Sequence, residues 1–215
     1  MILKLDINDK IKKRYNRISR IYEGMDRMIK RDWRAELLSN ATGRVLEVGI
    51  GTGGNLTFYP EHIESLTGVD FSKGMLNHAR KKVTQLNKKF PIELMEADIQ
   101  DLPFENNSFD TIISTCVFCS VPDPIIGLKE LGRVCKPDGT ILMLEHMRSE
   151  HRLIGWAMDI MNPITVNIWG ANINRDTIKN IEYADLKIES DSRLMGSILK
   201  RLSVKPNKVF QSRAL

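Results

Sequence analysis

A glycine-rich turn that follows a short apolar run constrains the fold of this chain more than any other feature. The run covers residues 44–48, and the turn after it contains Gly49, Gly51, Gly53 and Gly54. Glycine is favoured where a strand turns tightly and a ligand must approach the backbone. Asp70 ends the next apolar run, nineteen residues after Gly51. A carboxylate at that position can accept from both hydroxyls of a ribose, so the pair predicts a nucleoside cofactor.

Two kinds of cofactor fit the spacing of these glycines. Gly49, Gly51 and Gly54 match the dinucleotide pattern, whereas Gly49, Gly51 and Gly53 match the shorter pattern of methyltransferases, which Glu47 would begin. A carboxylate beside a pyrophosphate would be repelled, whereas S-adenosyl-L-methionine brings an ammonium and a sulfonium and no phosphate. Glu47 therefore favours S-adenosyl-L-methionine.

The middle of the chain alternates between strand and helix patterns. Strands are predicted at residues 44–48, 66–69, 92–96, 109–115 and 140–145. A helix start is predicted after the glycine turn, and helices are predicted from the Ser72 cap to residue 86 and at 124–135, with a turn at 136–139. Such alternation indicates βαβ units and a parallel sheet with right-handed crossovers.

The C-terminal third is less regular. Residues 150–172 are predicted to form a helical cap, with a break at Asn162-Pro163. Asn174 is expected to open a helix that contains Thr177–Ala184, and Asp185 stands where a left-handed cap is expected. Strands are predicted at 186–189 and 203–210. The predicted organisation is a basic N-terminal element at 1–40 and one domain at 41–215.

The N-terminal element is basic and amphipathic. Apolar residues recur there every three or four positions, and a second short helix is predicted at 33–38. Residues 1–34 contain eleven Lys or Arg and five Asp or Glu, so the net charge of +5 of the whole chain arises from this segment. The pattern predicts either a lid over the cofactor or an anchor on an anionic membrane surface. A solvated basic helix is the alternative.

Four motifs, the first of which contains the glycine turn, resemble those of class I S-adenosylmethionine-dependent methyltransferases. They are VLEVGIGTG, GVDFSKGML, EADIQDLPFENNSFDTII and LGRVCKPDGTILMLE, in that order. The segments TCVFCSV, LEHM and WGANINRDT resemble methyltransferase-like thiol- and lipid-associated enzymes. The overall plan is also similar to bacterial phosphatidylethanolamine N-methyltransferases and menaquinone C-methyltransferases. The resemblance implies an α/β, Rossmann-like, doubly wound and mostly parallel seven-stranded sheet with helices on both faces, plus the N-terminal helix and the helical cap.

The resemblance also implies a set of cofactor residues. Gly49, Gly51, Thr52 and Gly53 would hold the methionine part, with Glu47 and Asn55 beside them. Asp70 would hold the ribose, Phe71 and Met75 would pack near the adenine, and Asp98 would accept from its amino group, with Ile99 adjacent. Thr115 lies where the sulfonium and acceptor would meet. Tyr15 and Tyr22 could close over the cofactor or simply pack in the amphipathic stripe.

The acceptor side is predicted from the ends of the fourth and fifth strands. The substrate pocket is expected to contain Cys116, Phe118, Cys119, His146 and Trp169. His146 is the candidate catalytic base or acceptor-orienting residue, and a helix-capping or surface histidine is the alternative. Cys116 and Cys119 have too few partners at suitable spacing for zinc, so no metal site is predicted.

The predicted acceptor is a small or amphiphilic molecule. Trp156, Met158, Met161 and Trp169 make the cap apolar, which suits a greasy acceptor. A phospholipid head-group amine or a small thiol ranks first and a quinone ring second. An RNA-binding methyltransferase or a non-catalytic module that binds S-adenosylmethionine is the rival, although no RNA module is recognisable. Three cysteines and no apolar run of eighteen residues favour a cytoplasmic protein. The basic segment adds a peripheral position on the inner membrane face as an alternative.

Overall fold

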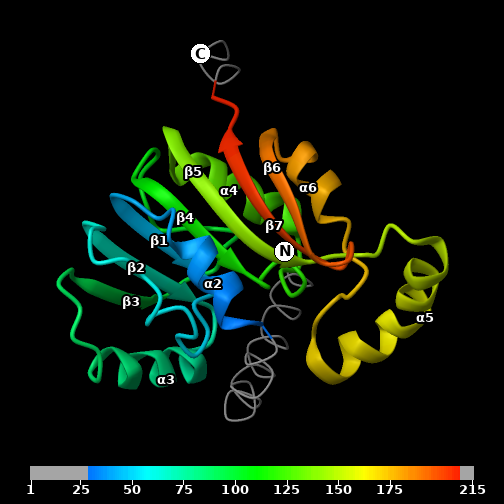
Figure 1. The fold of residues 1–215 in the computed structure, drawn as a ribbon, viewed down its shortest axis with the longest axis horizontal. Coiled ribbons are helices and arrows are strands. Elements are labelled where there is room, and N and C mark those ends of the chain that lie inside the picture. The colour runs from blue at the N-terminus through cyan, green and yellow to red at the C-terminus, as the bar shows by residue number, and fades with distance from the viewer. Residues whose placement is uncertain (1–28, 209–215) are drawn as a thin grey trace.

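A seven-stranded sheet forms the centre of the molecule. The computed structural model describes residues 29–208, apart from the side chain of Trp169. The strands are β1 (Arg44–Val48), β2 (Ser65–Asp70), β3 (Ile92–Glu96), β4 (Phe109–Thr115), β5 (Cys135–His146), β6 (Leu186–Met195) and β7 (Leu199–Pro206). Their order is β3-β2-β1-β4-β5-β7-β6, and β7 alone is antiparallel to both of its neighbours (Figure 1). The predicted doubly wound, mostly parallel seven-stranded sheet is confirmed.

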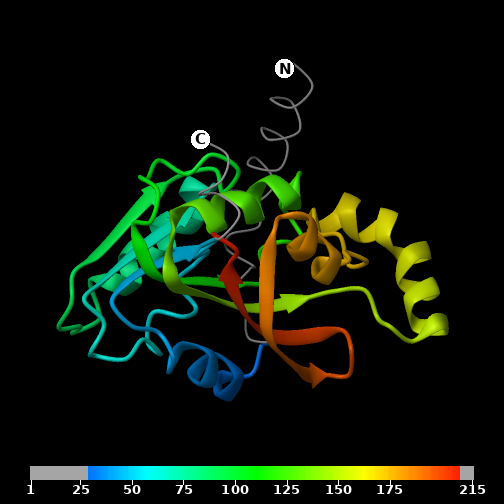
Figure 2. The ribbon, with the colours of Figure 1, turned by 90° about the horizontal axis from the view of Figure 1, so that it is seen from above.

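Helices cover both faces of this sheet. The described helices are α2 (Arg31–Leu38), α3 (Lys73–Val83), α4 (Pro124–Val134), α5 (Arg152–Trp169) and α6 (Thr177–Tyr183). Leu37 and Leu38 of α2 and Leu76 of α3 share one apolar cluster, whereas Leu128 of α4 and Ile181 of α6 belong to another. Figure 2 shows α2 and α4 on opposite sides of the sheet. The central strands are therefore buried on both faces, which explains why they read as continuous apolar runs.

Two helices begin where they are predicted, α3 at the predicted Ser72 cap and α4 at a cap on Asp123 that the sequence analysis does not name. The hydroxyl of Ser72 accepts from the backbone N–H of Met75, and the Asp123 carboxylate accepts from Ile125 N and Ile126 N. Each cap satisfies backbone donors that the first turn of a helix leaves free. Both caps lie at the carboxyl edge of the sheet, so they also fix the two loops that border the site described below.

The helix predicted after the glycine turn does not form. Residues 50–63 consist of successive turns, in which Gly53 N donates to Ile50 O, Leu56 N to Gly53 O and Phe58 N to Asn55 O. These bonds join residues three apart, whereas an α-helix joins residues four apart. Gly49, Gly51 and Gly53 have positive φ angles, which an α-helix does not allow.

The prediction of a turn at residues 136–139 is also wrong. This segment belongs to β5, which begins at Cys135 directly after α4. Phe109 pairs with Cys135 and Thr111 with Thr140, so the register between β4 and β5 shifts in this region. Residues 136–139 of β5, which the sequence analysis predicts as a turn, are the extra residues of this register shift.

The predicted helical cap exists, but Pro163 does not break it. Helix α5 runs from Arg152 to Trp169 with Pro163 inside. A proline removes one backbone hydrogen bond and costs about 3 kcal/mol. Met158 and Thr165 are buried on either side of it, and their packing holds the flanking turns in place. Gly170, in the left-handed conformation, ends the helix.

Helix α6 begins later than predicted. Asp176, rather than Asn174, caps it by accepting from Lys179 N, while the Asn174 amide donates to the Asp159 carboxylate. Aspartate is among the strongest capping residues. Asp185 follows the helix with a φ of 58°, as predicted.

The last two strands form a hairpin that the sequence predicts only in part. β6 is longer than the predicted 186–189, and β7 starts at Leu199 rather than at residue 203. Lys200 lies in β7 with its side chain buried, and its ammonium donates to Glu150 and Asp191 at 2.8 Å each. A charged residue at a buried position interrupts the alternation of apolar and polar residues by which a strand is predicted, so the start of β7 could not be predicted from that pattern. Phe210, the predicted end of the strand, lies outside the described residues.

Candidate functional site

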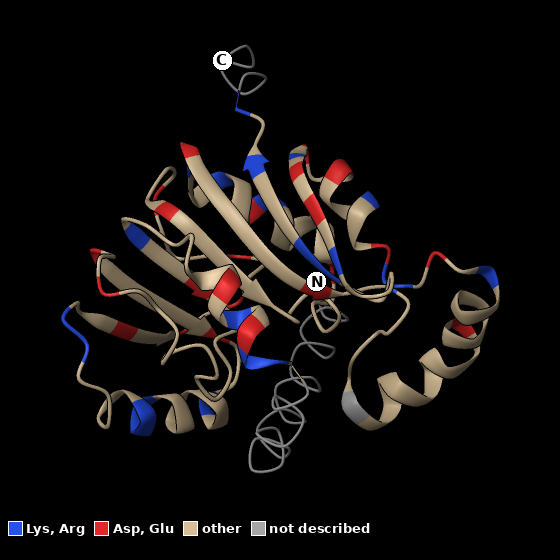
Figure 3. Ribbon diagram, in the orientation of Figure 1, with Lys and Arg blue, Asp and Glu red and all other residues tan. Residues whose placement is uncertain are grey.

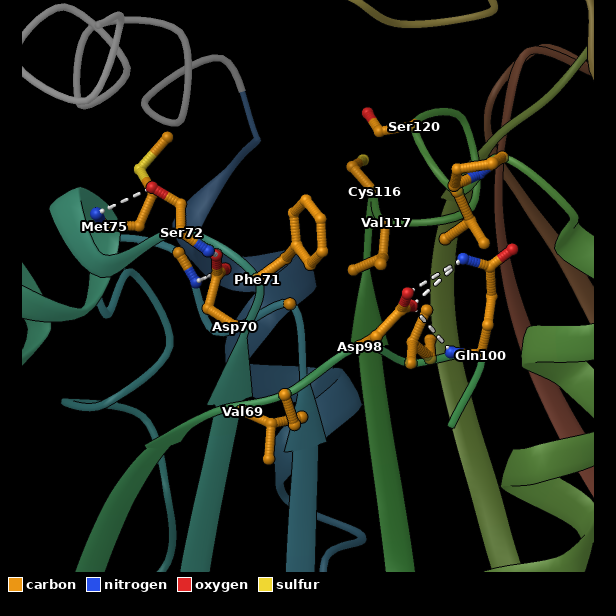
Figure 4. A pocket seen from close by; sticks show the side chains of 16 residues that line it. Val69, Asp70, Phe71, Ser72, Met75, Asp98, Gln100, Cys116, Val117 and Ser120 are labelled. Atoms are coloured by element: carbon orange, nitrogen blue, oxygen red, sulfur yellow. Dashed lines mark hydrogen bonds between the residues drawn. The ribbon is translucent and has the colours of Figure 1, made fainter. Parts of the chain in front are cut away.

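An open cavity of about 760 Å³ lies at the carboxyl edge of the parallel strands. Most of its lining comes from four segments: the glycine turn with Gly49 and Gly51, the end of β2 with Asp70 and Phe71, the loop after β3 with Asp98 and Ile99, and the loop after β4 with Cys116 and Val117. Figure 4 shows Asp70 and Phe71 on one side of this cavity and Val117 and Gln100 on the other. Ligands of open α/β sheets bind in such a crevice.

A smaller, narrow cavity adjoins the first. Gly49 and Gly51 line both cavities, and the smaller one is also bordered by Arg34, Glu47, Thr52, Asn55 and Thr115. The backbone of the glycine turn is therefore the shared wall. A Cβ on Gly49 would stand 2.5 Å from a methyl of Val117, so only glycine leaves this wall open.

The Asp70 carboxylate is fixed by backbone donors at the end of β2. One oxygen accepts from Gly51 N and the other from Ser72 N, both at 2.8 Å. Burial raises the pKa of Asp70 to about 6, and the hydrogen bonds from Ser72, Gly51 and Phe71 oppose that rise. The carboxylate thus ties the glycine turn to the start of α3 while it faces the larger cavity.

Asp98 is oriented by Gln100, a residue that the sequence analysis missed. The Gln100 amide donates to the two Asp98 oxygens at 3.0 and 3.2 Å, and Gln100 N donates to Asp98 Oδ1 at 2.9 Å. The amide oxygen of Gln100 accepts from Asp123 N, at the cap of α4. Gln100, drawn beside Asp98 in Figure 4, therefore links the loop after β3 to the loop before α4.

Asn55 is the centre of a buried polar network in the smaller cavity. Its amide N–H groups donate to Glu47 Oε1 at 2.8 Å and to Thr115 Oγ1 at 3.0 Å. Its oxygen accepts from Arg34 Nη1 at 2.6 Å, and the Tyr59 hydroxyl donates to Glu47 Oε2 at 2.8 Å. Burial raises the pKa of Tyr59 well above its ordinary value, so the phenol keeps its proton and donates to Glu47.

The smaller cavity presents opposite charges to one ligand. Glu47 and Arg34 are both buried and both line it. The hydroxyl oxygen of Thr52, which also lines it, is buried and has no hydrogen-bond partner within residues 29–208. A carboxylate, a guanidinium and an unsatisfied hydroxyl fit an ammonium and a carboxylate on one small molecule. The residues thus fit the amino-acid end of S-adenosyl-L-methionine, with the nucleoside toward Asp70.

Most predicted cofactor residues border one of the two cavities. Phe71, Met75, Asp98 and Ile99 line the larger one with Asp70, and Glu47, Thr52, Asn55 and Thr115 line the smaller one. Gly53 lines neither; its φ is 78°, and an added Cβ would meet Leu56 at 2.5 Å. Gly53 therefore shapes the turn rather than the cavity wall. Tyr15 and Tyr22 lie outside the described residues.

The predicted substrate residues are less well gathered. Cys116 lines the larger cavity with a φ of 53°, whereas Phe118 is fully buried in the hydrophobic core. Neither cavity is lined by the side chains of Cys119 and His146. The side chain of Trp169 lies outside the described part of the structure.

Three of these residues have perturbed acid–base properties. Burial raises the pKa of the Cys116 thiol well above its ordinary value and that of Cys119 to about 11, so both are neutral thiols near neutral pH. Burial lowers the pKa of His146, whose Nδ1 has no hydrogen-bond partner among the described residues. A neutral imidazole can accept a proton, but His146 lines neither cavity, so its catalytic role stays a prediction. Within residues 29–208, no three metal-ligating side chains form a cluster.

A buried carboxylate behind the acceptor side was also missed by the sequence analysis. Glu145, near the end of β5, accepts from the Ser114 hydroxyl at 2.6 Å and from Val117 N and Phe118 N at 3.2 Å each. These donors flank Cys116, so Glu145 holds the loop after β4 against the cavity. Burial raises the pKa of Glu145 to about 7.

Arg34 brings a positive charge to the smaller cavity, and a substitution tests whether that charge binds the ligand. Arg34→Gln removes the positive charge from the smaller cavity and keeps a group that can donate to Asn55. Binding of S-adenosyl-L-homocysteine is expected to weaken about tenfold, because one charge-assisted hydrogen bond is lost. Calorimetry measures the affinity, and thermal unfolding of Arg34→Gln checks the fold. Unchanged affinity with an intact fold would show that Arg34 does not face the ligand.

Comparison with known proteins agrees with this geometry. Residues 46–143 match the family model described as a methyltransferase domain. A phosphatidylethanolamine N-methyltransferase from Cereibacter sphaeroides is 39% identical over 104 residues, which are 48% of this chain and 51% of that protein. A demethylmenaquinone methyltransferase from Lactobacillus johnsonii is 27% identical, over 90% of this chain and 86% of its own length.

Two further observations define the extent of this similarity. The chain spans only 38–60% of the length of four curated relatives that are at least 30% identical to it. A solved structure of a SAM-dependent methyltransferase from Thermotoga maritima, described as a possible histamine N-methyltransferase, superposes with a TM-score of 0.67 at 18% identity. The superposition covers 90% of this chain and 99% of the Thermotoga maritima protein, which shows that the two share a fold. The matched domain at residues 46–143, the sheet order and the paired cavities together support a class I S-adenosyl-L-methionine-dependent methyltransferase domain in this chain.

Proposed function

We propose that this protein transfers the methyl group of S-adenosyl-L-methionine to a small or amphiphilic acceptor, either a phospholipid head-group amine or a small thiol. The observation that carries the proposal is the meeting of two cavities at Gly49 and Gly51, one lined by Arg34 and Glu47 and the other by Asp70. A ligand with a zwitterionic end and a ribose can occupy both at once. Its sulfonium would then lie near the glycine turn.

The chemistry needs alignment more than it needs a catalytic group. The sulfonium supplies the electrophilic methyl, and the acceptor lone pair must approach it in line while water is excluded. The wall opposite Asp70 is largely apolar, with Cys116, Val117 and Val121, and Gln100 and Ser120 add polar groups to it. A largely apolar wall favours an uncharged amine or thiol over a charged acceptor. A base is required only when the acceptor must lose a proton, and His146 is the candidate for that role.

A quinone ring is the second candidate acceptor. Relatives named as demethylmenaquinone methyltransferases support it, and one of them matches over 90% of this chain. Carbon methylation of a hydroquinol requires that a hydroxyl be deprotonated, so a base would be essential for that reaction. This requirement separates the quinol from a neutral amine, which can be methylated without a base, whereas a thiol, like the quinol, must first lose its proton.

Product identification tests the proposal. The protein is incubated with S-adenosyl-L-methionine that carries a deuterated methyl group and with separate panels of phospholipid amines, small thiols and quinols. Mass spectrometry is expected to find the labelled methyl on an amine or a thiol. Label only on quinol carbon would replace the first acceptor with the second. If no acceptor in the three panels is methylated although the protein binds S-adenosyl-L-homocysteine, a non-catalytic module or an RNA substrate is favoured.

The basic segment at residues 1–34 is proposed to contact anionic lipid. Each basic residue near an anionic bilayer contributes about 1 kcal/mol. Replacing Lys12, Lys13, Arg14 and Arg17 with glutamine is expected to reduce sedimentation with phosphatidylglycerol vesicles at low salt by at least tenfold. Binding of S-adenosyl-L-homocysteine should barely change. If the wild-type protein does not sediment, the segment is a lid or a solvated helix instead.

A further inference from the structure

Helix α5 has an exposed apolar face that no described part of the chain covers. Nine large hydrophobic residues of the described chain are exposed, and seven of them belong to α5: Leu153, Ile154, Trp156, Ile160, Met161, Ile164 and Ile168. Their exposed fractions range from 45% to 73%. Isolated exposed apolar residues are common, but a contiguous group on one element marks an interaction surface.

The exposed residues follow the geometry of the helix. Leu153, Trp156, Ile160, Ile164 and Ile168 recur at intervals of three or four and therefore form one stripe. Met158 and Thr165 are buried on the other side, toward the domain. A helix that is apolar on both sides needs a partner on each. The domain supplies one partner, and the exposed stripe is left for the second.

Charge around α5 indicates the chemistry of that second partner. The one charged residue between Leu153 and Ile168 is Asp159, whose carboxylate pairs with Arg148 at 2.8 Å and accepts from Asn174. Arg152, the first residue of the helix, is exposed. Figure 3 shows α5 with almost no charged residues along its length. Apolar side chains with a tryptophan and a terminal arginine are typical of a helix that lies in a membrane interface.

The described end of the basic segment joins the domain beside the smaller cavity. Arg34 lines that cavity, and the nearby Lys30 and Arg31 are exposed. Basic side chains at this position complement anionic lipid head groups. None of the described helices is long and apolar enough to cross a membrane, so α5 would lie along a bilayer.

The segment after α5 is fastened to the wall of the larger cavity. Asn172 donates to the Cys119 carbonyl through its backbone N–H at 2.8 Å and through its amide at 3.2 Å. Arg175 donates to the Val121 carbonyl at 2.8 Å. Val121 lines the cavity, and Cys119 belongs to the same loop. A surface that binds α5 is thereby held close to the acceptor side of the site.

We propose that the exposed face of α5 docks on an anionic phospholipid bilayer and places the acceptor side of the site at its surface. The inference rests on the proposed function only in that the acceptor is an amphiphile. It accounts for an apolar helix that the domain leaves half covered, and it gives a lipid acceptor a short path from the bilayer to the cavity.

Vesicle binding of a matched pair of variants tests this proposal. One variant replaces Leu153, Trp156 and Ile160 with serine. The control variant replaces Tyr183 and Met195 with serine in the same way, because these are the two exposed large hydrophobic residues of the described chain outside α5. Each protein is sedimented with vesicles of equal parts phosphatidylcholine and phosphatidylglycerol, without a methyl donor. The α5 variant is expected to lose about 100-fold in partitioning, because three side chains no longer insert, whereas the control stays near wild type.

Other outcomes overturn the proposal. Equal partitioning of the α5 variant and the wild type, or no wild-type binding at all, would exclude α5 as the docking face. Light scattering that shows a wild-type dimer and a monomeric α5 variant, with vesicle binding unchanged, would assign the face to a second copy. Binding of S-adenosyl-L-homocysteine by both variants checks their fold. Methylation of a water-soluble thiol or amine is measured separately, so failure of the docking proposal is distinguishable from failure of the proposed function.

Discussion

Replacing Asp70 with alanine is expected to weaken the binding of S-adenosyl-L-homocysteine by about 30- to 1000-fold, which corresponds to roughly 2–4 kcal/mol. The carboxylate faces the larger cavity and would accept from both ribose hydroxyls. Its loss also removes the acceptor for Gly51 N and Ser72 N, which hold the glycine turn against α3. The ligand therefore loses direct contacts, and the wall shared by the two cavities loses its support.

The pH dependence of binding gives an independent measure of the same contact. Burial raises the pKa of Asp70 from 3.8 to about 6, so the free carboxyl gains a proton as the pH falls through about 6. Ribose hydroxyls donate to the ionised form, and affinity should thus fall below that pH and level off above it. Asp70→Asn should bind weakly with a flat profile through this range. Calorimetry across the range, with thermal unfolding to check the fold, measures both effects.

One result would remove Asp70 from the proposed site. If Asp70→Ala binds S-adenosyl-L-homocysteine as tightly as the wild type and remains folded, the ribose is held elsewhere. NADH serves as the control ligand, because the zwitterionic pair of Arg34 and Glu47 does not suit a pyrophosphate. Saturable binding of NADH would reopen the dinucleotide interpretation of the glycine spacing.

The parallel half of the fold could be predicted because its physics is local. Strands β1, β2 and β4 are short and largely buried, so each appears as a compact apolar run bounded by turn residues. The edge strand β3 is only partly buried, and turn residues bound it in the same way. Ser72 and the Asp123-Pro124 pair mark the starts of their helices through caps that depend on neighbouring residues. The residues that line the cavities at the ends of these strands could be predicted for the same reason, since the carboxyl ends of parallel strands meet at one edge.

The remaining features depend on contacts between distant parts of the chain. Arg34 reaches the smaller cavity from α2 through Asn55, twenty-one residues later, and nothing in its local pattern shows this. Lys200 hides the start of β7 because Glu150 and Asp191 neutralise it after folding. Gln100 and Glu145 appear as an ordinary loop residue and an ordinary strand end, and only the packing of the loop after β4 gives them a role.

Glu145 gives the second large expected effect, a stability that changes with pH. Burial raises its pKa from 4.5 in the unfolded chain to about 7, so folding favours the protonated carboxyl. Its stabilising contribution is complete below about pH 4.5 and is lost as the pH rises through about 7. With about 1.4 kcal/mol for each unit of pKa shift, the wild-type free energy of unfolding should fall by about 3 kcal/mol across this interval from this group.

Glu145→Gln isolates that contribution, because the amide resembles the protonated carboxyl and does not titrate. Denaturant unfolding at a series of pH values should give curves for wild type and Glu145→Gln that diverge by about 3 kcal/mol between about pH 4.5 and 7, with the variant gaining as the pH rises. At high pH the wild-type protein keeps an ionised Glu145 because Ser114, Val117 and Phe118 donate to it. The loop beside Cys116 is thus held by a charge that costs folding free energy. Parallel curves would show that Glu145 does not titrate in this interval, and its hold on the loop would then not depend on its charge.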